Sequence, residues 1–518
     1  MLCQLLFRLR LYDMFFDALG FMICFLKGDL FMYTFIGGIL LLVIGFFTYG
    51  KIVEKNFGIV PDRQTPAFSH RDNLDYVPMP RWKNLIIELL NIAGTGPIFG
   101  PIMGALYGPV AYIWIVFGCI FAGAVHDYMT GMISLRFNGM QLPELASRLL
   151  GKGTRHIVNI FSILLLLLVG TVFVISPATL IQSMLPFSIS LIVITILIFV
   201  FYLISTVLPI DKTLGKIYPW FGAILILSTG AIGICLLFSG HDLPNLTAAS
   251  LKNMHPAGMP IFPGMFFTIS CGALSGFHAT QAPMVSRTLE NESEGRSVFY
   301  GMMIAEGVIA MIWAAASMSL FDGQTLMQVI DQGTPSLVVN KVSYMLLGST
   351  LGTIAITGVI VLPISSGLSA FRSCRLILAE YFKVKQDTLG KILMVTLPLY
   401  AISFGLTFVN FNILWRYFNW ANQTTAMIAL FVASRYLYLK GKNYFMTLIP
   451  GSLMLYAVFM YILSEHIGFN MGLTTLSYSL GALLTCGVIA AFFITGKKKK
   501  EGLPTTAFVL NDDRMILE

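Results

Sequence analysis

Charged residues are scarce in this sequence. Asp, Glu, Lys and Arg make up 11% of the 518 residues, whereas a soluble domain carries about 25%. Hydrophobic residues make up 56% of the chain. This composition excludes an ordinary soluble domain and indicates an α-helical protein that crosses the membrane many times. In such a protein the meaning of the net charge of +8 depends on which loops carry the charges. The net charge by itself does not indicate nucleic-acid binding.

Cysteine motifs are also missing. The chain has seven cysteines, none of them in a CxxC pair, and most lie in apolar stretches. They are better explained as small buried residues than as a disulfide or metal framework. The HExxH motif of metalloproteases is absent as well. We therefore expect no cofactor and no structural metal.

Apolar stretches of membrane-spanning length are abundant. Stretches of about 20 apolar residues, the length that a helix needs to cross a bilayer, recur along nearly the whole chain. They predict thirteen transmembrane helices, at residues 31–52, 85–107, 109–135, 157–183, 186–208, 217–239, 260–283, 297–320, 343–368, 389–409, 411–439, 443–465 and 471–495.

The two ends of the chain differ from this pattern. Residues 1–30 are apolar but short, carry Asp13 and Asp17, and lack the small-residue cleavage site of a signal peptide. We expect an interfacial helix or a leader there. We expect a transmembrane domain at 31–495 and a basic tail at 496–518.

The distribution of lysine and arginine predicts the orientation. Placing the run KKKK at 497–500 in the cytoplasm puts most of the 33 Lys and Arg residues in cytoplasmic segments. Lys252 and Lys341 fall in external loops. Because a miscounted span would invert every later loop, this agreement with the positive-inside rule supports thirteen spans and a cytoplasmic C-terminus.

Two predicted spans contain glycine and proline where a regular helix would be expected. Residues 91–109 read NIAGTGPIFGPIMGALYGP, and residues 260–283 contain TISCGALSGFHATQAP. Irregular backbone survives at membrane depth only where it is buried in protein or lines a cavity. Both spans therefore predict broken helices that expose backbone groups inside the protein.

The spacing of the broken spans predicts an inverted repeat. They are the second and seventh spans, an offset of five. Because five is odd, the two halves, 84–239 and 260–439, have opposite orientations. Paired broken helices in inverted halves are typical of a transporter substrate site. The alternative is that these glycines only permit close helix packing. The expected backbone contributors, with neighbouring side chains, are Gly94, Thr95, Gly96, Cys271, Ser275 and Gly276.

Ionisable residues inside spans are costly in lipid and usually functional. His126 and Asp127 lie in the third span, His278 in the seventh and Glu306 in the eighth. Asp127 and Glu306 are both expected about 12–14 Å inside the cytoplasmic surface, from a rise of ~1.5 Å per residue. We expect His126, Asp127 and Glu306 to handle protons and His278 to lie beside the substrate. The alternative role is structural, and no ligand spacing supports a metal site of His126, Asp127 and His278.

Two further spans carry polar side chains. Asn422 and Gln423 lie within about one turn of Asn419 in the eleventh span, where they are candidates for substrate hydrogen bonds or for bonds between helices. Ser365 and Ser366 lie in the third span of the second half. They form a possible sodium site, since this helix often lends hydroxyls to sodium in five-plus-five transporters.

These stretches together resemble the carbon-starvation protein A family, over roughly residues 33–495. The resemblance lies in TPAFSHRDNLDYVPMPRW, IAGTGPIFGPIMGALYG, FAGAVHDYMTGMISLRFNG, FFTISCGALSGFHATQ, YGMMIAEG and LWRYFNWANQ. It is closest to the shorter form of the family. One departure is Leu368, where many members have Asp, so this chain lacks an acid at that position.

The resemblance implies an inner-membrane secondary transporter of the amino acid–polyamine–organocation type. Its implied substrates are short peptides and pyruvate-like acids, carried by proton symport. The expected partners are thus a small molecule, a coupling ion and the lipid bilayer, without nucleic acid. The alternatives are a sodium-coupled transporter of the same fold, a channel, or an intramembrane enzyme using His126, Asp127 and His278, although no nucleophile–base spacing supports an enzyme.

Overall fold

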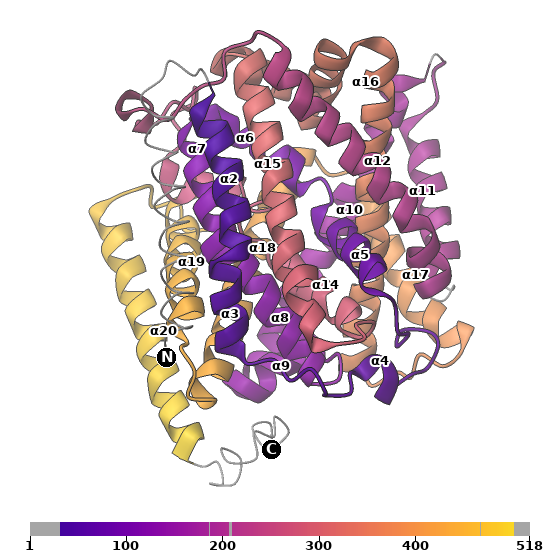
Figure 1. The fold of residues 1–518 in the computed structure, drawn as a ribbon, viewed down its shortest axis with the longest axis vertical. Helices are drawn as coiled ribbons and strands as arrows, with labels where there is room; N and C mark the ends of the chain where they lie inside the picture. Colours follow the sequence, from indigo (N-terminus) through magenta and orange to yellow (C-terminus); the bar gives the residue numbers. More distant parts are fainter. Residues whose placement is uncertain (1–31, 186, 207–209, 467, 502–518) are drawn as a thin grey trace, which may run out of the picture.

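The computed structural model describes residues 32–185, 187–206, 210–466 and 468–501. The expected leader at 1–30 and residues 502–518 of the expected tail lie outside the described residues. Within these ranges the chain is helical, and its one β-bridge joins Met79 to Leu289. The helices form a single bundle with most of their axes along the long dimension of the molecule (Figure 1).

The α-helices follow one another along the chain, with a long connection between α12 and α13. They are α2 (Tyr33–Phe47), α3 (Tyr49–Phe57), α4 (Pro66–Ser69), α5 (Arg81–Ala93), α6 (Gly96–Gly104), α7 (Val110–Ile113), α8 (Ala124–Arg136), α9 (Leu142–Leu150), α10 (Thr154–Met184), α11 (Leu191–Thr206), α12 (Ile210–Phe238), α13 (Phe266–Thr268), α14 (Gly276–Ser286), α15 (Gly301–Leu320), α16 (Gly323–Tyr381), α17 (Leu389–Leu406), α18 (Phe411–Leu439), α19 (Phe445–Ser464) and α20 (Thr475–Glu501).

Six segments have 3-10 or π geometry. Some of them extend a neighbouring helix, as η2 does between α7 and α8. They are η1 (Ala105–Tyr107), η2 (Trp114–Gly123), η3 (Ala248–Leu251), η4 (Ile261–Met265), η5 (Glu292–Glu294) and η6 (Arg296–Tyr300).

Among the described residues, nine helices are long and apolar enough to cross a membrane, or ten if the bent pair Arg81–Ala93 and Gly96–Tyr107 is one span. The chain is therefore a multi-pass α-helical membrane protein, as predicted. The expected number of thirteen spans stays a prediction. The expected fifth span is a helix of only 16 residues, α11, and the expected seventh span, like the second, is divided, here between η4–α13 and α14.

The largest difference from the predicted spans is in α16. The sequence predicts a span at 343–368, whereas one helical run of 59 residues covers Gly323–Tyr381. A straight helix of that length would measure nearly 90 Å at ~1.5 Å per residue, far more than a bilayer. The run contains two residues with positive φ, Thr334 and Gly348, which no regular right-handed helix includes.

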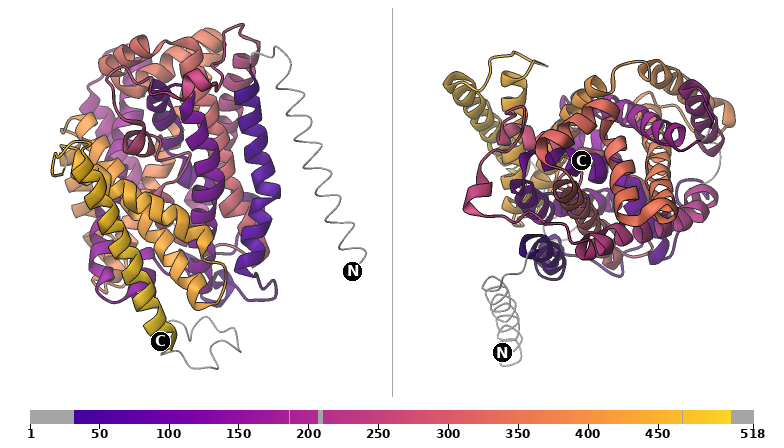
Figure 2. Two further views of the ribbon diagram at one scale, coloured as in Figure 1. Left: turned by 90° about the vertical axis from the view of Figure 1, so that its left-hand side faces the viewer. Right: turned by 90° about the horizontal axis from the view of Figure 1, so that it is seen from above.

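The outermost helices present apolar side chains at the surface. Leu483 in α20 is 69% exposed and Leu227 in α12 is 72% exposed. Helices α19 and α20 lie along one edge of the bundle, and α11, α12 and α17 lie along the other (Figure 1); the view from above shows α19 and α20 outside the main ring of helices (Figure 2). Such surfaces are stable in lipid, where apolar exposure carries no hydrophobic cost.

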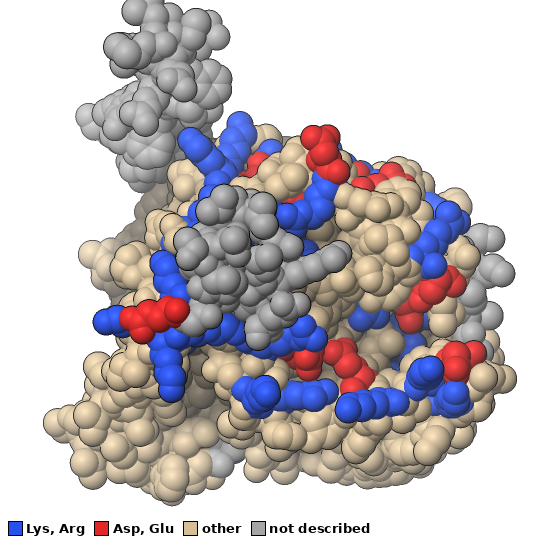
Figure 3. Space-filling view, turned by 90° about the horizontal axis from the view of Figure 1, so that it is seen from below, with Lys and Arg blue, Asp and Glu red and all other residues tan. Residues whose placement is uncertain are grey.

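Basic residues gather on the face of the bundle that carries α4, α9 and the C-terminal end of α20. Figure 3 shows this basic face, with Lys and Arg side chains spread across it.

Below the surface of this basic face, Arg136 at the end of α8 forms a buried ion pair with Glu292, with Nη2 3.1 Å from Oε2 and Nε 3.2 Å from Oε1. The same guanidinium donates to the Gly58 carbonyl oxygen at 2.6 Å and to the Tyr436 hydroxyl at 3.0 Å. These bonds tie α8, α18 and the chain after α3 together at this face.

Candidate substrate and coupling site

The first broken span has its break between α5 and α6. Helix α5 ends at Ala93, α6 begins at Gly96, and their axes differ by 45°. Gly94 has a φ of +40°, a conformation that favours glycine. Two prolines, Pro97 and Pro101, follow in α6, where the first occupies an initial position that needs no backbone donor. The glycine and proline pattern thus opens the helix as predicted.

The second broken span is interrupted over a longer segment. Helix α13 ends at Thr268 and α14 begins at Gly276, so the seven residues 269–275 are not helical. Gly272 within this segment has a φ of +88°. Both predicted breaks are therefore present, and each divides its span into two short helices.

The two breaks lie in direct contact. A Cβ atom added at Gly96 would overlap the Cβ and Sγ atoms of Cys271, and one added at Gly100 would lie 3.0 Å from the Thr268 carbonyl oxygen. These glycines therefore allow one broken span to lie against the other. The packing explanation for the glycines and the broken-backbone explanation both hold, at different residues.

Helix α18 holds the second break in place with three amide side chains. Asn422 Oδ1 accepts from the Phe277 backbone N–H at 2.8 Å and from the Ser275 hydroxyl at 3.1 Å. Gln423 Nε2 donates to the Phe266 carbonyl oxygen at 2.8 Å. Asn422 thus caps the start of α14, and Gln423 binds the first residue of α13. Asn419 accepts from the Ser270 hydroxyl at 3.1 Å.

Replacing Asn422 with Ala should destabilise the protein. The change leaves a buried backbone N–H at the start of α14 without its acceptor, and an unsatisfied buried donor costs about 1–3 kcal/mol. We expect a lower midpoint of thermal unfolding in detergent. The control is Asn412→Ala on the exposed face of the same helix, which should leave the midpoint unchanged. An N422A protein as stable as the wild type would contradict the capping role.

Ser366 performs a similar task at the first break. Its hydroxyl donates to the Leu90 carbonyl oxygen at 2.5 Å and accepts from the Gly94 backbone N–H at 3.0 Å. Ser365 instead donates to the Leu362 carbonyl within its own helix, at 2.7 Å. The pair was expected as a possible sodium site. In this conformation Ser366 is a clamp that ties α16 to the broken end of α5.

Four ionisable side chains form a chain of contacts beside the second break. Asp127 lies between two imidazoles, with His126 Nδ1 2.7 Å from Oδ1 and His278 Nδ1 2.8 Å from Oδ2. His278 Nε2 in turn lies 3.4 Å from Glu306 Oε2. All four side chains are at most 1% exposed. The structure thus brings together the residues that the sequence singled out from spans three, seven and eight.

Glu88 is a further acidic residue at this place that the sequence reasoning missed. It lies on α5, is fully buried, and interacts electrostatically with Asp127, His278 and Glu306. Neither of its carboxyl oxygens has a hydrogen-bond partner among the described residues. A usable signal was present, because Glu88 and Asn91 lie three residues apart, on one helix face just before the break at Gly94.

The family follows from comparison with known proteins. The carbon starvation protein CstA family matches the chain over residues 31–211 and 175–355. This chain belongs to that family. The matched region includes both broken spans. It also includes the four contacting side chains, which we call the acid–imidazole chain: His126, Asp127, His278 and Glu306.

Three relatives of this CstA family member are similar to it in sequence. A membrane protein of Haemophilus influenzae is 45% identical over 346 residues, covering 57% of the chain and 93% of that protein. The peptide transporter CstA of Campylobacter jejuni is 28% identical, covering 54% of the chain and 49% of the relative. The pyruvate/proton symporter BtsT of Escherichia coli is 27% identical, covering 51% of the chain and 46% of the relative. The chain thus spans about half the length of the two transporters.

One solved structure supports the fold. A Na⁺-coupled sialic acid symporter in a substrate-bound outward-open state superposes with a TM-score of 0.50 at 14% sequence identity, covering 91% of this chain and 98% of the symporter. At this identity the likeness concerns the fold alone. It agrees with the predicted transporter-like architecture.

The site of this CstA family member is closed to solvent in the conformation described. Five of its residues are fully buried: Thr95, Ser275, His278, Asn422 and Gln423.

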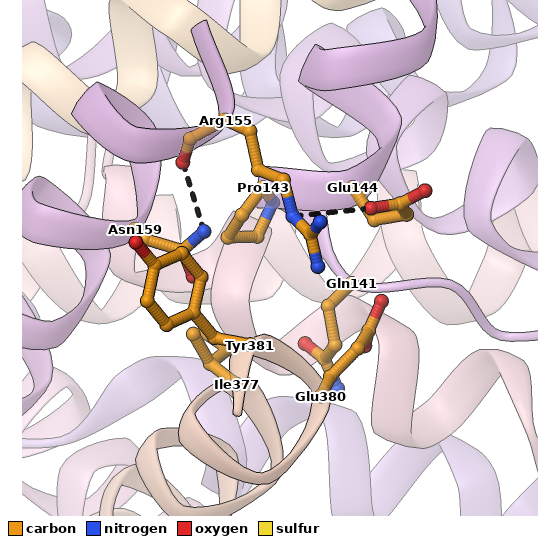
Figure 4. Close-up of a pocket in the computed structure, with 8 residues that line it drawn as sticks. All are labelled: Gln141, Pro143, Glu144, Arg155, Asn159, Ile377, Glu380 and Tyr381. Carbon is orange, nitrogen blue, oxygen red and sulfur yellow. Dashed lines mark hydrogen bonds and ion pairs between the residues drawn. The ribbon is translucent and has the colours of Figure 1, made fainter. Parts of the chain in front are cut away.

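A small crevice lies elsewhere, between α9, the start of α10 and the end of α16. Figure 4 shows its lining residues: Gln141, Pro143, Glu144, Arg155, Asn159, Ile377, Glu380 and Tyr381. An ion pair between Arg155 and Glu144 crosses it at 3.4 Å, and none of the predicted site residues lines it.

Proposed function

We propose that this protein is a secondary active transporter that imports short peptides or pyruvate-like small organic acids by proton symport. The observation that carries the proposal is the meeting of two broken helices at a buried chain of acids and imidazoles. Broken helices supply backbone groups for a substrate at mid-membrane, and buried ionisable groups mark coupling-ion paths. The names of the two transporter relatives favour these substrate classes.

The substrate is proposed to bind between the two breaks. Gly94, Thr95 and Gly96 would contribute from the first break, and Cys271, Ser275 and Gly276 from the second. Asn422, Gln423 and His278 line the second break. Thr95 Oγ1, Asn422 Nδ2 and Gln423 Oε1 are buried without a hydrogen-bond partner among the described residues. Buried polar atoms without partners are costly, and a bound substrate would supply the missing partners.

The coupling proton is proposed to reside on the acid–imidazole chain. Asp127 and Glu306 contact His278 from opposite sides of its ring, at Nδ1 and Nε2. A proton that arrives on Glu306 can thus be passed to His278 without crossing lipid, and His126 assists by holding Asp127. Helices α8 and α14, which carry three of these residues, would rock with their neighbours during alternating access.

The topology of the proposal follows the sequence. Thirteen spans with inverted halves at 84–239 and 260–439 would place the basic face in the cytoplasm, together with the C-terminus, in a bacterial inner membrane. The basic residues of Figure 3 support this orientation, because positive charge concentrates on the cytoplasmic side.

Sodium coupling is the alternative for the same fold. It would use the hydroxyl oxygens of Ser365 and Ser366, whose O–H groups donate to backbone carbonyls in this conformation. The proton is favoured by the name of one relative, a pyruvate/proton symporter. An enzymatic role has less support, since the named relatives above are transporters.

Uptake into proteoliposomes tests the proposal. Labelled pyruvate and a labelled dipeptide are offered separately, with a proton gradient or a sodium gradient imposed in turn. We expect the proton gradient to drive accumulation of at least one of them. Liposomes without protein and liposomes with collapsed gradients are the controls. Accumulation driven by sodium alone would contradict proton symport, and no uptake of either compound would contradict the substrate assignment.

A further inference from the structure

Three potential metal ligands converge next to the broken spans. Cys271 Sγ, a ring nitrogen of His278 and a carboxylate oxygen of Glu306 all lie within 4.8 Å of one another, and all three residues are buried. Ligand atoms around one zinc ion are about 3–4 Å apart, given metal–ligand distances of about 2.0–2.3 Å. A small rotation of these side chains would bring the three atoms to that spacing.

The position of Asp127 prepares His278 for such a role. Asp127 Oδ2 lies 2.8 Å from His278 Nδ1. An ionised carboxylate accepts hydrogen bonds and cannot donate them, so Nδ1 carries hydrogen and the lone pair of the neutral ring lies on Nε2. A carboxylate that holds a histidine in this way is the usual outer partner of a metal-bound imidazole.

The inner-facing atoms of His278 and Glu306 are not fully occupied, whereas the Cys271 sulfur lies 3.3 Å from the Ser275 hydroxyl oxygen. Among the described residues, His278 Nε2 and both carboxyl oxygens of Glu306 lack a well-formed hydrogen bond; the contact between them, at 3.4 Å, is a loose one. Buried polar atoms of this kind usually indicate a missing partner. One ligand atom from each of these two residues lies within 4.8 Å of the Cys271 sulfur.

Charge balance also favours a cation there. Glu88, Asp127 and Glu306 place three carboxyl groups around two histidines, and neither carboxyl oxygen of Glu88 has a hydrogen-bond partner among the described residues. A divalent ion bound by the Cys271 thiolate and the Glu306 carboxylate is neutral overall, which removes the cost of burying unpaired charge. Binding releases the thiol proton to solvent.

We propose that Cys271, His278 and Glu306 form a binding site for a divalent transition-metal ion of the zinc class, and that the bound ion blocks transport. The mixed sulfur, nitrogen and oxygen ligand set selects zinc-like ions over Mg²⁺ and Ca²⁺, which prefer oxygen. Inhibition follows because the ion would join the second break to α15, through Cys271 and Glu306, and fix elements that must move. The inhibition part rests on the proposed transport function; the binding part does not.

Cobalt is a suitable probe of the ligand set. The purified full-length protein in detergent is titrated with Co²⁺, and the absorption of the thiolate–cobalt charge transfer is recorded. We expect one Co²⁺ per chain, an intense near-ultraviolet band, and loss of that band when Zn²⁺ is added. The Cys271→Ser variant should lose the band, and Glu306→Gln should weaken Co²⁺ affinity by at least tenfold.

The matched control is Cys374→Ser, which removes another fully buried cysteine and should leave the band intact. Thermal unfolding identifies any variant that has not folded. Absence of the band in the wild type, or its persistence in C271S, would overturn the site.

Zinc inhibition of wild-type uptake is measured separately in proteoliposomes. Saturating Zn²⁺ should block uptake, and full uptake by zinc-loaded protein would overturn the inhibitory role. If the cobalt band behaves as expected but no uptake occurs without zinc, the metal site stands and the proposed function fails.

Discussion

Asp127→Asn should reduce proton-driven uptake by at least ~100-fold. The variant keeps the shape of the side chain but removes the carboxylate that contacts His126 at 2.7 Å and His278 at 2.8 Å. An amide does not titrate near neutral pH and cannot take up or release a coupling proton, and its NH₂ group would face one of the two imidazole donors. A ~100-fold loss corresponds to about 2.7 kcal/mol on the transport barrier, since each ~1.4 kcal/mol is a factor of ten in rate.

The measurement is the initial rate of uptake into proteoliposomes under an imposed proton gradient. Asp387→Asn is the control, because Asp387 is an exposed acid that pairs with Lys391 at 2.7 Å and contributes little to stability. It should transport at the wild-type rate. Full accumulation by D127N at wild-type stability would remove Asp127 from the coupling mechanism.

Gly276→Ala should destabilise the protein by about 3 kcal/mol or more. The added Cβ would overlap the Asn422 carbonyl oxygen and the Ala426 backbone nitrogen. Because both are backbone atoms of α18, no side-chain rotation relieves the overlap. Overpacking costs about 1–3 kcal/mol even where neighbours can adjust. Here the displacement of α14 also stretches the hydrogen bonds of Asn422 to Ser275 and Phe277.

The loss is measured as the midpoint of thermal unfolding in detergent, followed by monomer recovery on size exclusion. Gly230→Ala in α12 is the matched control, since no neighbouring atom lies within 4 Å of the added Cβ. That variant should be as stable as the wild type. A G276A protein with an unchanged midpoint would show that α14 is not packed against α18 as described.

Much of the site followed from residue types at particular depths. Glycine and proline inside an apolar span have few explanations in lipid, so the breaks near Gly94 and Gly272 could be predicted. Ionisable residues inside spans are equally rare, which singled out His126, Asp127, His278 and Glu306. Their placement at a similar depth agrees with the observed contacts among them.

Other features depend on tertiary packing that no single span reveals. Glu88 lies near the start of its predicted span, where an acid normally meets headgroups and water. In the folded bundle it is fully buried, because α5 is packed among α12, α14, α15 and α16. Likewise, nothing in the local sequence distinguishes a serine that binds sodium from Ser366. This serine forms hydrogen bonds with Leu90 and Gly94, which lie 276 and 272 residues earlier in the sequence.

The position of Cys271 beside two other potential ligands could not be predicted, because interpretation of the sequence treats all seven cysteines alike. Cysteines scattered through apolar spans are usually small buried residues, and Cys374 fits that description. Cys271 differs because the non-helical segment 269–275 brings it against Gly96 and beside His278 and Glu306. The local sequence predicted that Cys271 lies at the break. Its proximity to Glu306 on α15 depends on how the helices pack, which the local sequence does not reveal.

The central claim is that substrate and proton move together through this site. It is tested most directly by trapping a pH-sensitive dye inside proteoliposomes and adding substrate outside, without any imposed gradient. We predict internal acidification that depends on pyruvate or a dipeptide and is absent from D127N proteoliposomes. Uptake of labelled substrate with no change in internal pH would contradict proton symport.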